Sequence, residues 1–166
     1  MRLEAMAVKI PHVEDHPNRV AFEGVLTLVN TASDKPPSGA RGHRVMLTRE
    51  AADKALPSLL GMAVDYRPGW DGHDARRKIG LLTEADLAGK NLIVRGYLYA
   101  RDFPEVAAAI QAQAPQAMGM SYELADARVE DMRAEIWKLT RVTFTGAAIL
   151  LREKAAYRAT SFRMAS

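Results

Sequence analysis

The sequence of 166 residues contains no cysteine. This absence excludes a disulfide scaffold, a zinc or iron–sulfur site built on thiolates, and a thiol nucleophile. Long apolar runs are also missing, since none approaches the roughly 18 residues that a membrane span needs. The N-terminal MRLEAMAVKI has an acid at Glu4 and no long apolar core, so it does not resemble a signal peptide. We therefore expect an intracellular protein.

A strong charge bias is absent from most of the chain. The formal net charge is +3, and residues 151–166 hold four bases and one acid, so this segment accounts for all of it. A neutral body does not favour a specific nucleic-acid-binding protein. We interpret residues 158–166 as a basic C-terminal tail.

The remaining residues, 1–157, have the length and composition of a single domain. A chain of this size buries on the order of 70% of the surface that its unfolded form exposes, so its core needs no covalent support. Within the domain, residues 31–43 (TASDKPPSGARGH) are rich in Pro, Gly and Ser. This composition predicts a flexible loop.

Hydrophobic periodicity and turn residues predict many strands and two helices. Thr48 is placed to cap a helix over 49–56, and Asp102 with Glu105 forms a capping-box pattern before a second helix over 105–113. The expected strands are 5–10, 20–29, 62–66, 79–85, 91–99, 118–125 and 135–145. This pattern indicates an α+β fold built on a small, mostly antiparallel β-barrel or strongly curved sheet flanked by a few helices.

The strand around Ser121 shows a clear alternation of side chains. Met118, Met120, Tyr122 and Leu124 fall on one face, and Gly119, Ser121 and Glu123 fall on the other. Ser121 therefore faces away from the core, and Gly119 leaves room for another backbone or a peptide. Taken alone, the pattern is typical of a solvent-facing serine, because it lacks the second glycine of a nucleophile elbow.

A serine nucleophile needs a base, and the chain has four histidines. His12 and His16 lie between Pro11 and Pro17, which favours a loop over a helical metal site. His43 lies in a Gly/Arg loop and has no obvious partner.

The fourth histidine, His73, lies between Asp71 and Asp74 in the stretch WDGHD. Neighbouring carboxylates favour the imidazolium and can orient a ring nitrogen, as a general base requires. A solvated turn histidine fits the same spacing. A third hypothesis is that the protein is a metal-dependent hydrolase that uses His73, Asp71 and Asp74 with His12 or His16.

The order of these pieces resembles the tailed-phage prohead proteases. A loop with His73 and Asp74 precedes a strand that starts at Ile79, and a hairpin, a helix, the strand of Ser121 and a final strand follow. The similarity spans about residues 20–157. These capsid-maturation serine peptidases share a fold with the herpesvirus assembly protease. The resemblance implies an α+β fold around a small barrel, with Ser121 as nucleophile and His73 as general base.

The resemblance also implies the protein's role and surroundings. It describes a serine endopeptidase that processes scaffold and major capsid protein, and the protease itself, during procapsid maturation. Such an enzyme works as a homo-oligomer inside the assembling procapsid in the host cytoplasm. It uses no cofactor or metal and binds neither membrane nor specific nucleic acid. The alternative is a proteolytically inactive relative that acts as a structural or scaffold-binding component.

The third catalytic member is where the chain departs from the family. The family commonly has Glu in its final strand where this chain has Arg141, and an arginine cannot accept a hydrogen bond from histidine. Asp71 and Asp74 are near His73 in sequence. We prefer Glu123, because it lies on the face of Ser121, about 6.6–7 Å further along the strand.

The oxyanion of the tetrahedral intermediate also needs backbone N–H donors. Gly146 and Ala147 follow the last predicted strand. We interpret them as the oxyanion-hole residues.

Overall fold

The computed structural model describes residues 17–114 and 116–165, so the predicted strand at 5–10 lies outside the described part. The strands are β1 (Arg19–Leu28), β2 (Arg44–Leu47), β3 (Ala63–Asp65), β4 (Lys78–Ala88), β5 (Asn91–Tyr99), β6 (Met118–Val129), β7 (Ile136–Leu151) and β8 (Ser161–Met164). The helical segments are α1 (Arg49–Ala55), η1 (Leu56–Leu59), α2 (Pro104–Gln111) and η2 (Arg152–Lys154). None of the helices in this part of the chain is long and apolar enough to cross a membrane.

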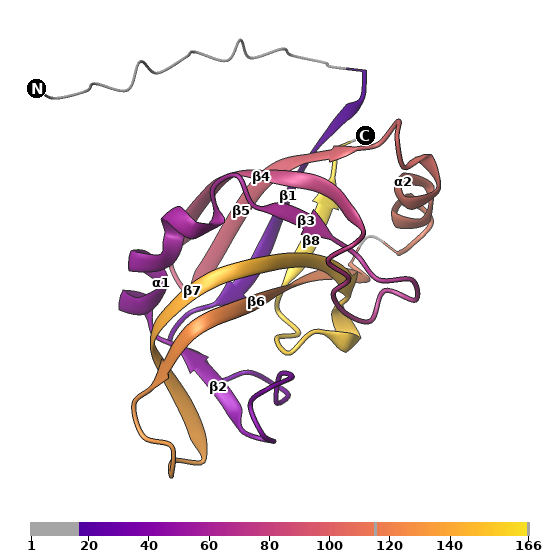
Figure 1. Cartoon of the computed structure of the whole chain (residues 1–166). Helices are drawn as coiled ribbons and strands as arrows, with labels where there is room; N and C mark the ends of the chain where they lie inside the picture. Colours follow the sequence, from indigo (N-terminus) through magenta and orange to yellow (C-terminus); the bar gives the residue numbers. More distant parts are fainter. Residues whose placement is uncertain (1–16, 115, 166) are drawn as a thin grey trace, which may run out of the picture.

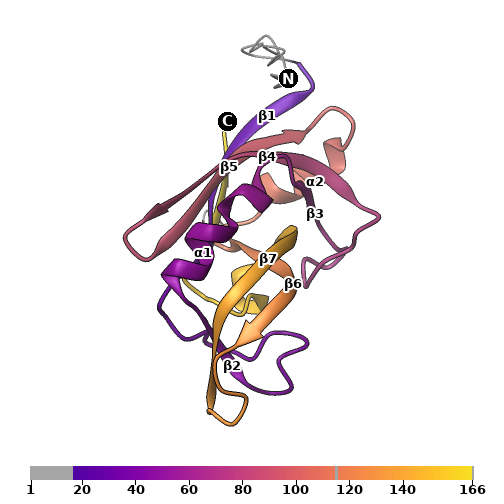
Figure 2. The same cartoon turned by 60° about the vertical axis from the view of Figure 1, so that its left-hand side comes forward.

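The described strands form one sheet in the order β2-β7-β3-β4-β5-β1-β8, and β6 pairs with β7. All neighbours are antiparallel except β2–β7 and β3–β7, which are parallel. The sheet curves strongly into a half-barrel, with α1 and α2 at its periphery (Figures 1 and 2). The predicted α+β fold on a strongly curved, mostly antiparallel sheet is confirmed.

Strand β7 is longer than the sequence pattern predicts. The expected strand ended at residue 145, but β7 continues through GAAILL to Leu151, and residues 146–150 are all buried. A strand covered on both faces reads as a continuous run of small and apolar residues and loses the alternation that marks a half-exposed strand. The buried end of β7 includes Ala148, which pairs with Ser121 of β6.

The two helix caps have different outcomes. The Thr48 hydroxyl accepts a hydrogen bond from the Ala51 amide at 3.2 Å, so the predicted cap of α1 is confirmed. The predicted cap at Asp102 is wrong, because α2 has Phe103 at its N-cap and no side-chain cap bond. A residue before proline avoids helical angles, so Phe103 cannot lie inside a helix ahead of Pro104. Asp102 instead accepts a hydrogen bond from Asn18 at 2.9 Å.

The end of the chain also differs from the prediction. Within the predicted tail at 158–166, Ser161–Met164 forms β8, which pairs antiparallel with β1. Phe162 is buried against Phe22, with ring centroids 4.9 Å apart. One buried aromatic thus fixes a segment whose composition resembles a tail.

The segment predicted as a flexible loop, residues 31–43, makes specific contacts with the rest of the chain. The amides of Asp34 and Lys35 both donate to the carbonyl of Ala156. The Ser33 hydroxyl is fully buried and accepts a hydrogen bond from the Val45 amide at 3.0 Å. The segment thereby lies against residues 153–158, which follow β7.

Candidate active site

The structure brings Ser121 and His73 together. Ser121 is half-buried on β6, and His73 lies in residues 66–77, which connect β3 to β4. Nε2 of His73 is 3.1 Å from Oγ of Ser121. This is the distance at which an imidazole can accept the proton of a serine hydroxyl.

Two carboxylates face the other ring nitrogen of His73. Nδ1 is 3.7 Å from Oδ1 of Asp65 and 3.7 Å from Oε1 of Glu123. The two acids differ in burial, since the Asp65 side chain is 2% exposed and that of Glu123 is 52% exposed. Nδ1 itself is buried and has no hydrogen-bond partner among the described residues. A contraction of less than about 1 Å toward either acid would form that bond.

Asp65 is the residue that sequence reasoning missed. It ends the short strand β3, and its Oδ1 also accepts the Asp74 amide at 3.1 Å. The available signal was an acid directly after a buried apolar strand residue, since a buried carboxylate usually has a specific partner.

Strand register explains how Asp65, His73 and Ser121 meet. Ala148 of β7 pairs with Ser121 of β6 on one side and with Asp65 of β3 on the other. Directly paired residues point to the same face, so the serine and the carboxylate stand on one face, about 9.5 Å apart at two strand spacings. The imidazole bridges this distance across β7, above the small side chain of Ala148.

Glu123 reaches the same place from β6. It stands two residues after Ser121 and pairs with Gly146 of β7. A Cβ at position 146 would lie 2.9 Å from Oε2 of Glu123, so the glycine leaves space for the carboxylate. Gly146 therefore accommodates the side chain that was predicted as third member.

The two acids next to His73 in sequence point elsewhere. Asp71 pairs with Arg67 at 3.6 Å, and Asp74 accepts bonds from the Arg76 amide and the Arg77 guanidinium. The bond from the Arg76 amide is the main reason that the pKa of Asp74 lies below its ordinary value. These contacts shape the loop and leave His73 Nδ1 to Asp65 and Glu123.

The loop is also tied to the strand beneath the site. The Leu151 amide at the end of β7 donates to the carbonyl of Trp70 at 2.9 Å. Together with the bond from Asp74 to Asp65, this contact anchors the histidine loop on both sides of His73.

The predicted oxyanion-hole residues lie inside the sheet. Gly146 pairs with Glu123 and Ala147 with Tyr122 of β6, and Ala147 also pairs with Val64 of β3. Ladder hydrogen bonds occupy backbone amides in such positions. Both residues therefore lie within the β7 ladder, and their role as oxyanion-hole donors stays a prediction.

The space beside Gly119 is filled by the chain itself. A Cβ there would lie 2.5 Å from the Thr160 hydroxyl and 2.9 Å from the Arg152 side chain. The Thr160 hydroxyl also accepts a bond from the Met120 amide at 3.3 Å. The expected room for a peptide at Gly119 is therefore used by residues 152–160.

Tyr122, the neighbour of Ser121, points to the opposite face of β6. Its ring packs edge-on against Phe144, with centroids 5.5 Å apart. Burial raises the pKa of Tyr122 to about 12, and the side chains of Thr27 and Tyr157 lie beside its hydroxyl. Tyr122 thus stays neutral at ordinary pH, and it packs against the core while part of it lines the groove.

Arg141, at the position of the family's expected acid, lies far from His73. It is exposed on β7 and pairs with Arg128, whereas Ser121 pairs with Ala148. Seven residues of strand separate the two levels, which is about 23 Å. An arginine at position 141 therefore does not alter the surroundings of the imidazole.

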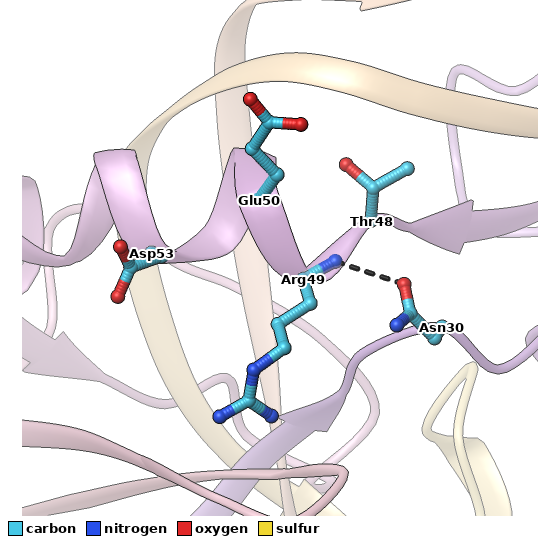
Figure 3. Close-up of a pocket in the computed structure, with 5 residues that line it drawn as sticks. All are labelled: Asn30, Thr48, Arg49, Glu50 and Asp53. Atoms are coloured by element: carbon cyan, nitrogen blue, oxygen red, sulfur yellow. Dashed lines mark hydrogen bonds between the residues drawn. The ribbon is translucent and has the colours of Figure 1, made fainter.

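Ser121 and His73 open into a groove with a volume of about 900 Å³. Its walls come from residues 35–41, from the histidine loop and from the far end of the β6–β7 hairpin. A smaller cavity of about 480 Å³ lies at the start of α1, where the Arg49 amide donates to Asn30, and it contains none of the predicted site residues (Figure 3).

The hypothesis of a metal-dependent hydrolase is not supported by any ligand cluster in residues 17–114 and 116–165. No group of three or more His, Asp or Glu side chains there is arranged to hold a metal ion. His12 and His16 lie outside the described residues.

No protein-family model matches the sequence, and no curated protein matches it. Among solved structures, the chain is similar to the KSHV protease in complex with a hexapeptide phosphonate inhibitor, with a TM-score of 0.54 and 11% identity over 89% of this chain and 65% of that one. The chain thus spans slightly less than two thirds of that protease. A second similar structure is the bacteriophage T4 capsid assembly protease, gp21, with a TM-score of 0.48 and 12% identity over 78% of this chain and 97% of that one. The fold of this chain is therefore shared with the KSHV protease.

Proposed function

We propose that this chain is a serine endopeptidase that acts in phage capsid maturation. The observation that carries the proposal is the 3.1 Å contact between His73 Nε2 and Ser121 Oγ, at the wall of a groove, on a fold shared with a viral protease. The resemblance of the motif order to prohead proteases supplies the substrate class, namely scaffold and major capsid protein. On this proposal the enzyme works as a homo-oligomer inside the procapsid in the host cytoplasm.

The reaction follows from the geometry of Ser121 and His73. Ser121 Oγ attacks the peptide carbonyl carbon while His73 Nε2 takes the hydroxyl proton. The imidazolium then returns this proton to the leaving amine, and the peptide C–N bond breaks to leave an acyl-serine. A water molecule, deprotonated by the same nitrogen, hydrolyses the ester and regenerates the serine.

The imidazolium formed in each step needs a negative partner at Nδ1. Asp65 and Glu123 both supply one at 3.7 Å. A charge interaction is stronger where solvent is excluded, so the buried Asp65 contributes more than the exposed Glu123. Glu123, the predicted third member, becomes an auxiliary carboxylate in this mechanism.

The proposal is tested by co-expressing the chain with the scaffold and capsid proteins of its phage. We expect processing by the unmodified protein and none by Ser121→Ala or His73→Ala, with equal amounts of folded protein in all three. Processing that persists in Ser121→Ala would show that the nucleophile is wrong.

A fluorophosphonate probe separates an active enzyme from an inactive structural component. We expect covalent labelling of the unmodified protein and no labelling of Ser121→Ala. Labelling and processing should both persist with a strong chelator present, and loss of processing would instead favour the metal-dependent reading.

A further inference from the structure

Two large apolar side chains are strongly exposed within the described residues. Leu60 is 55% exposed and Met132 is 51% exposed. Leu60 follows η1 and does not line the groove, whereas Met132 lines the groove that also contains Ser121 and His73. An exposed apolar side chain on a groove wall is available to a ligand, because ligand sites are lined mainly by apolar side chains.

Met132 is the exposed member of an apolar group in which Trp137 and Leu139 are only 7% and 5% exposed, and we call this group the distal wall. The distal wall comes from the far end of the β6–β7 hairpin and consists of Val129, Met132, Trp137 and Leu139. Pro36, Pro37 and Ala40 line the same groove from residues 31–43. Figures 1 and 2 show the hairpin end on the same side of the molecule as β2 and the segment before it.

The distal wall is held in place by several contacts. Trp137 Nε1 donates to the carbonyl of Met132 at 3.2 Å. The His43 ring stacks on Trp137, with centroids 4.4 Å apart and planes 14° apart, and its Nδ1 lies 3.1 Å from the carbonyl of Glu135. A surface fixed in this way loses little entropy when a ligand binds. Met132 is therefore presented by an ordered hairpin.

The polar and apolar parts of the groove lie apart along β6. Ser121 and Val129 are eight residues apart on that strand, with bulges between them. This separation is about 20–26 Å, which corresponds to about six to eight residues of an extended peptide. Leu124 and Ala127 line the groove between these levels. One extended segment can thus occupy the reaction site and reach the distal wall.

We propose that the distal wall recognises a large apolar side chain of the substrate, such as Leu, Met or Phe, about six to eight residues from the bond that is cut. This inference rests on the proposed function and adds a substrate requirement to it. It makes cleavage depend on a stretch of chain much longer than the residues at the scissile bond. A short peptide that ends before the distal wall would lack this contact.

The binding test uses the Ser121→Ala protein, so that the ligand stays intact. Overlapping 16-residue peptides that cover the scaffold protein are labelled with fluorescein, and their Kd values are measured by fluorescence polarisation. Met132→Glu should weaken the tightest peptides about tenfold, and Met132→Leu should restore their binding. Leu60→Glu is the matched control, because it places the same charge at an equally exposed apolar position outside the groove, and it should change nothing.

Substitution of the apolar residue in the bound peptides should reproduce the loss caused by Met132→Glu. With the Ser121-containing enzyme, Met132→Glu should raise KM for long peptides and leave kcat unchanged, with no effect on truncated peptides. Equal binding by Met132 and Met132→Glu proteins, or no binding of any scaffold peptide, would overturn the inference. Peptides that bind in a Met132-dependent way and are never cut would instead overturn the proposed function.

Discussion

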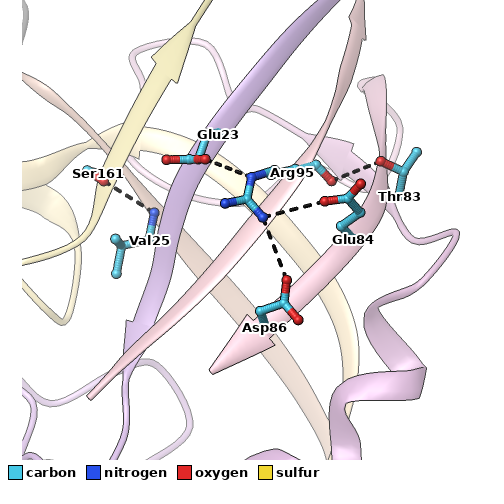
Figure 4. Close-up of polar contacts among 7 residues, drawn as sticks. All are labelled: Glu23, Val25, Thr83, Glu84, Asp86, Arg95 and Ser161. Atoms are coloured by element: carbon cyan, nitrogen blue, oxygen red, sulfur yellow. Dashed lines mark hydrogen bonds and ion pairs between the residues drawn. The ribbon is translucent and has the colours of Figure 1, made fainter. Parts of the chain in front are cut away.

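Two clusters in this molecule each place a single basic side chain among carboxylates from different strands. On the outer face, Arg95 of β5 lies 2.7 Å from Glu23, 3.4 Å from Glu84 and 3.6 Å from Asp86 (Figure 4). At the candidate site, His73 lies between Asp65 and Glu123. All side chains of the Arg95 cluster are 43% exposed or more, whereas those of His73 and Asp65 are 14% and 2% exposed.

The difference in burial decides what each cluster can do. The hydrogen bond to Glu23 raises the pKa of Arg95 above its already high value, so this side chain never releases a proton at ordinary pH. Its ion pairs face water, where they contribute little. A histidine can gain and lose a proton near neutral pH, and its partner Asp65 acts without screening by solvent. Of the two clusters, only that of His73 has a basic side chain able to exchange a proton near neutral pH.

The largest expected effect comes from Asp65→Asn. The amide keeps an oxygen that can accept the Asp74 amide bond, but it carries no charge to offset the imidazolium. We expect kcat to fall by about 10²–10⁴-fold, in the range seen when a buried triad carboxylate is replaced by its amide. Circular dichroism should show an unchanged fold. A kcat within twofold of the unmodified enzyme would remove Asp65 from the mechanism.

Ala148→Leu tests whether the imidazole needs the space above β7. A leucine between Asp65 and Ser121 would displace the His73 ring, and a misplacement of about 1 Å can cost about 10²-fold in rate. Ala148→Ser is the control, because it adds one small atom. We expect fluorophosphonate labelling to slow about 10²-fold in the leucine variant and to change little in the serine variant. Equal labelling in both variants would contradict this arrangement.

Acid should reduce the cleavage rate while the fold persists. Protonated Nε2 cannot accept the proton of Ser121, so on the acid side of its pH profile kcat/KM should fall about tenfold per pH unit. The lowered pKa of Asp74, in contrast, helps to keep the loop folded in mild acid. A carboxylate with a lowered pKa stabilises the folded state above its unfolded pKa, and this contribution is lost only as the pH falls through the lower folded value.

The contacts of Asp74 should therefore persist down to about its ordinary pKa of 3.8. Acid inactivation should be reversible, with unchanged near-ultraviolet circular dichroism down to that pH. Loss of tertiary signal together with activity would show that the loop, and not the imidazole, responds to acid.

Glu123→Gln should have a smaller effect than Asp65→Asn. The side chain is half exposed, so water screens its charge, and we expect kcat to fall less than about tenfold. Gly146→Ala offers an independent route to the same change, because the added Cβ would lie 2.9 Å from Oε2 of Glu123 and displace the carboxylate. A loss in Glu123→Gln that exceeds the loss in Asp65→Asn would reverse the assigned roles.

Local sequence pattern drew attention to Ser121 and His73, and the resemblance to prohead proteases suggested their roles. Period-two alternation placed Ser121 away from the core. His73 stood out because it lies among loop acids, although those acids turned out to serve the loop. Asp65 and Ala148 could not be found in this way, because their relation to Ser121 depends on the register of three strands. Such pairings join residues that are far apart in the chain, and they produce no periodic pattern in the sequence.

Two errors in the fold have equally physical causes. The cap at Asp102 fitted the spacing of a capping box, but the restriction that proline places on Phe103 moved the start of α2. Strand β8 is four residues long and depends on Phe162 for its burial. A single buried aromatic among small and basic residues gives too little pattern to predict a strand.

The smallest expected effect is that of Arg95→Ala. Its removal leaves Glu23, Glu84 and Asp86 to repel one another at the outer face, so we expect a slightly lower Tm at low salt. Added salt screens exposed charges, with a Debye length of about 10 Å at 0.1 M. The difference in Tm should therefore shrink as the ionic strength rises. Cleavage should be unchanged at every salt concentration.

The loss of kcat in Asp65→Asn should hardly depend on salt, because the Asp65 side chain is only 2% exposed. Thermal melts and kcat measured for both variants between 0.02 and 0.5 M salt, about the range over which the Debye length falls from over 20 Å to near 4 Å, would compare the two clusters directly. A salt-dependent loss of cleavage in Arg95→Ala would mean that the exposed cluster is coupled to the site. Burial would then not separate the functions of the two clusters.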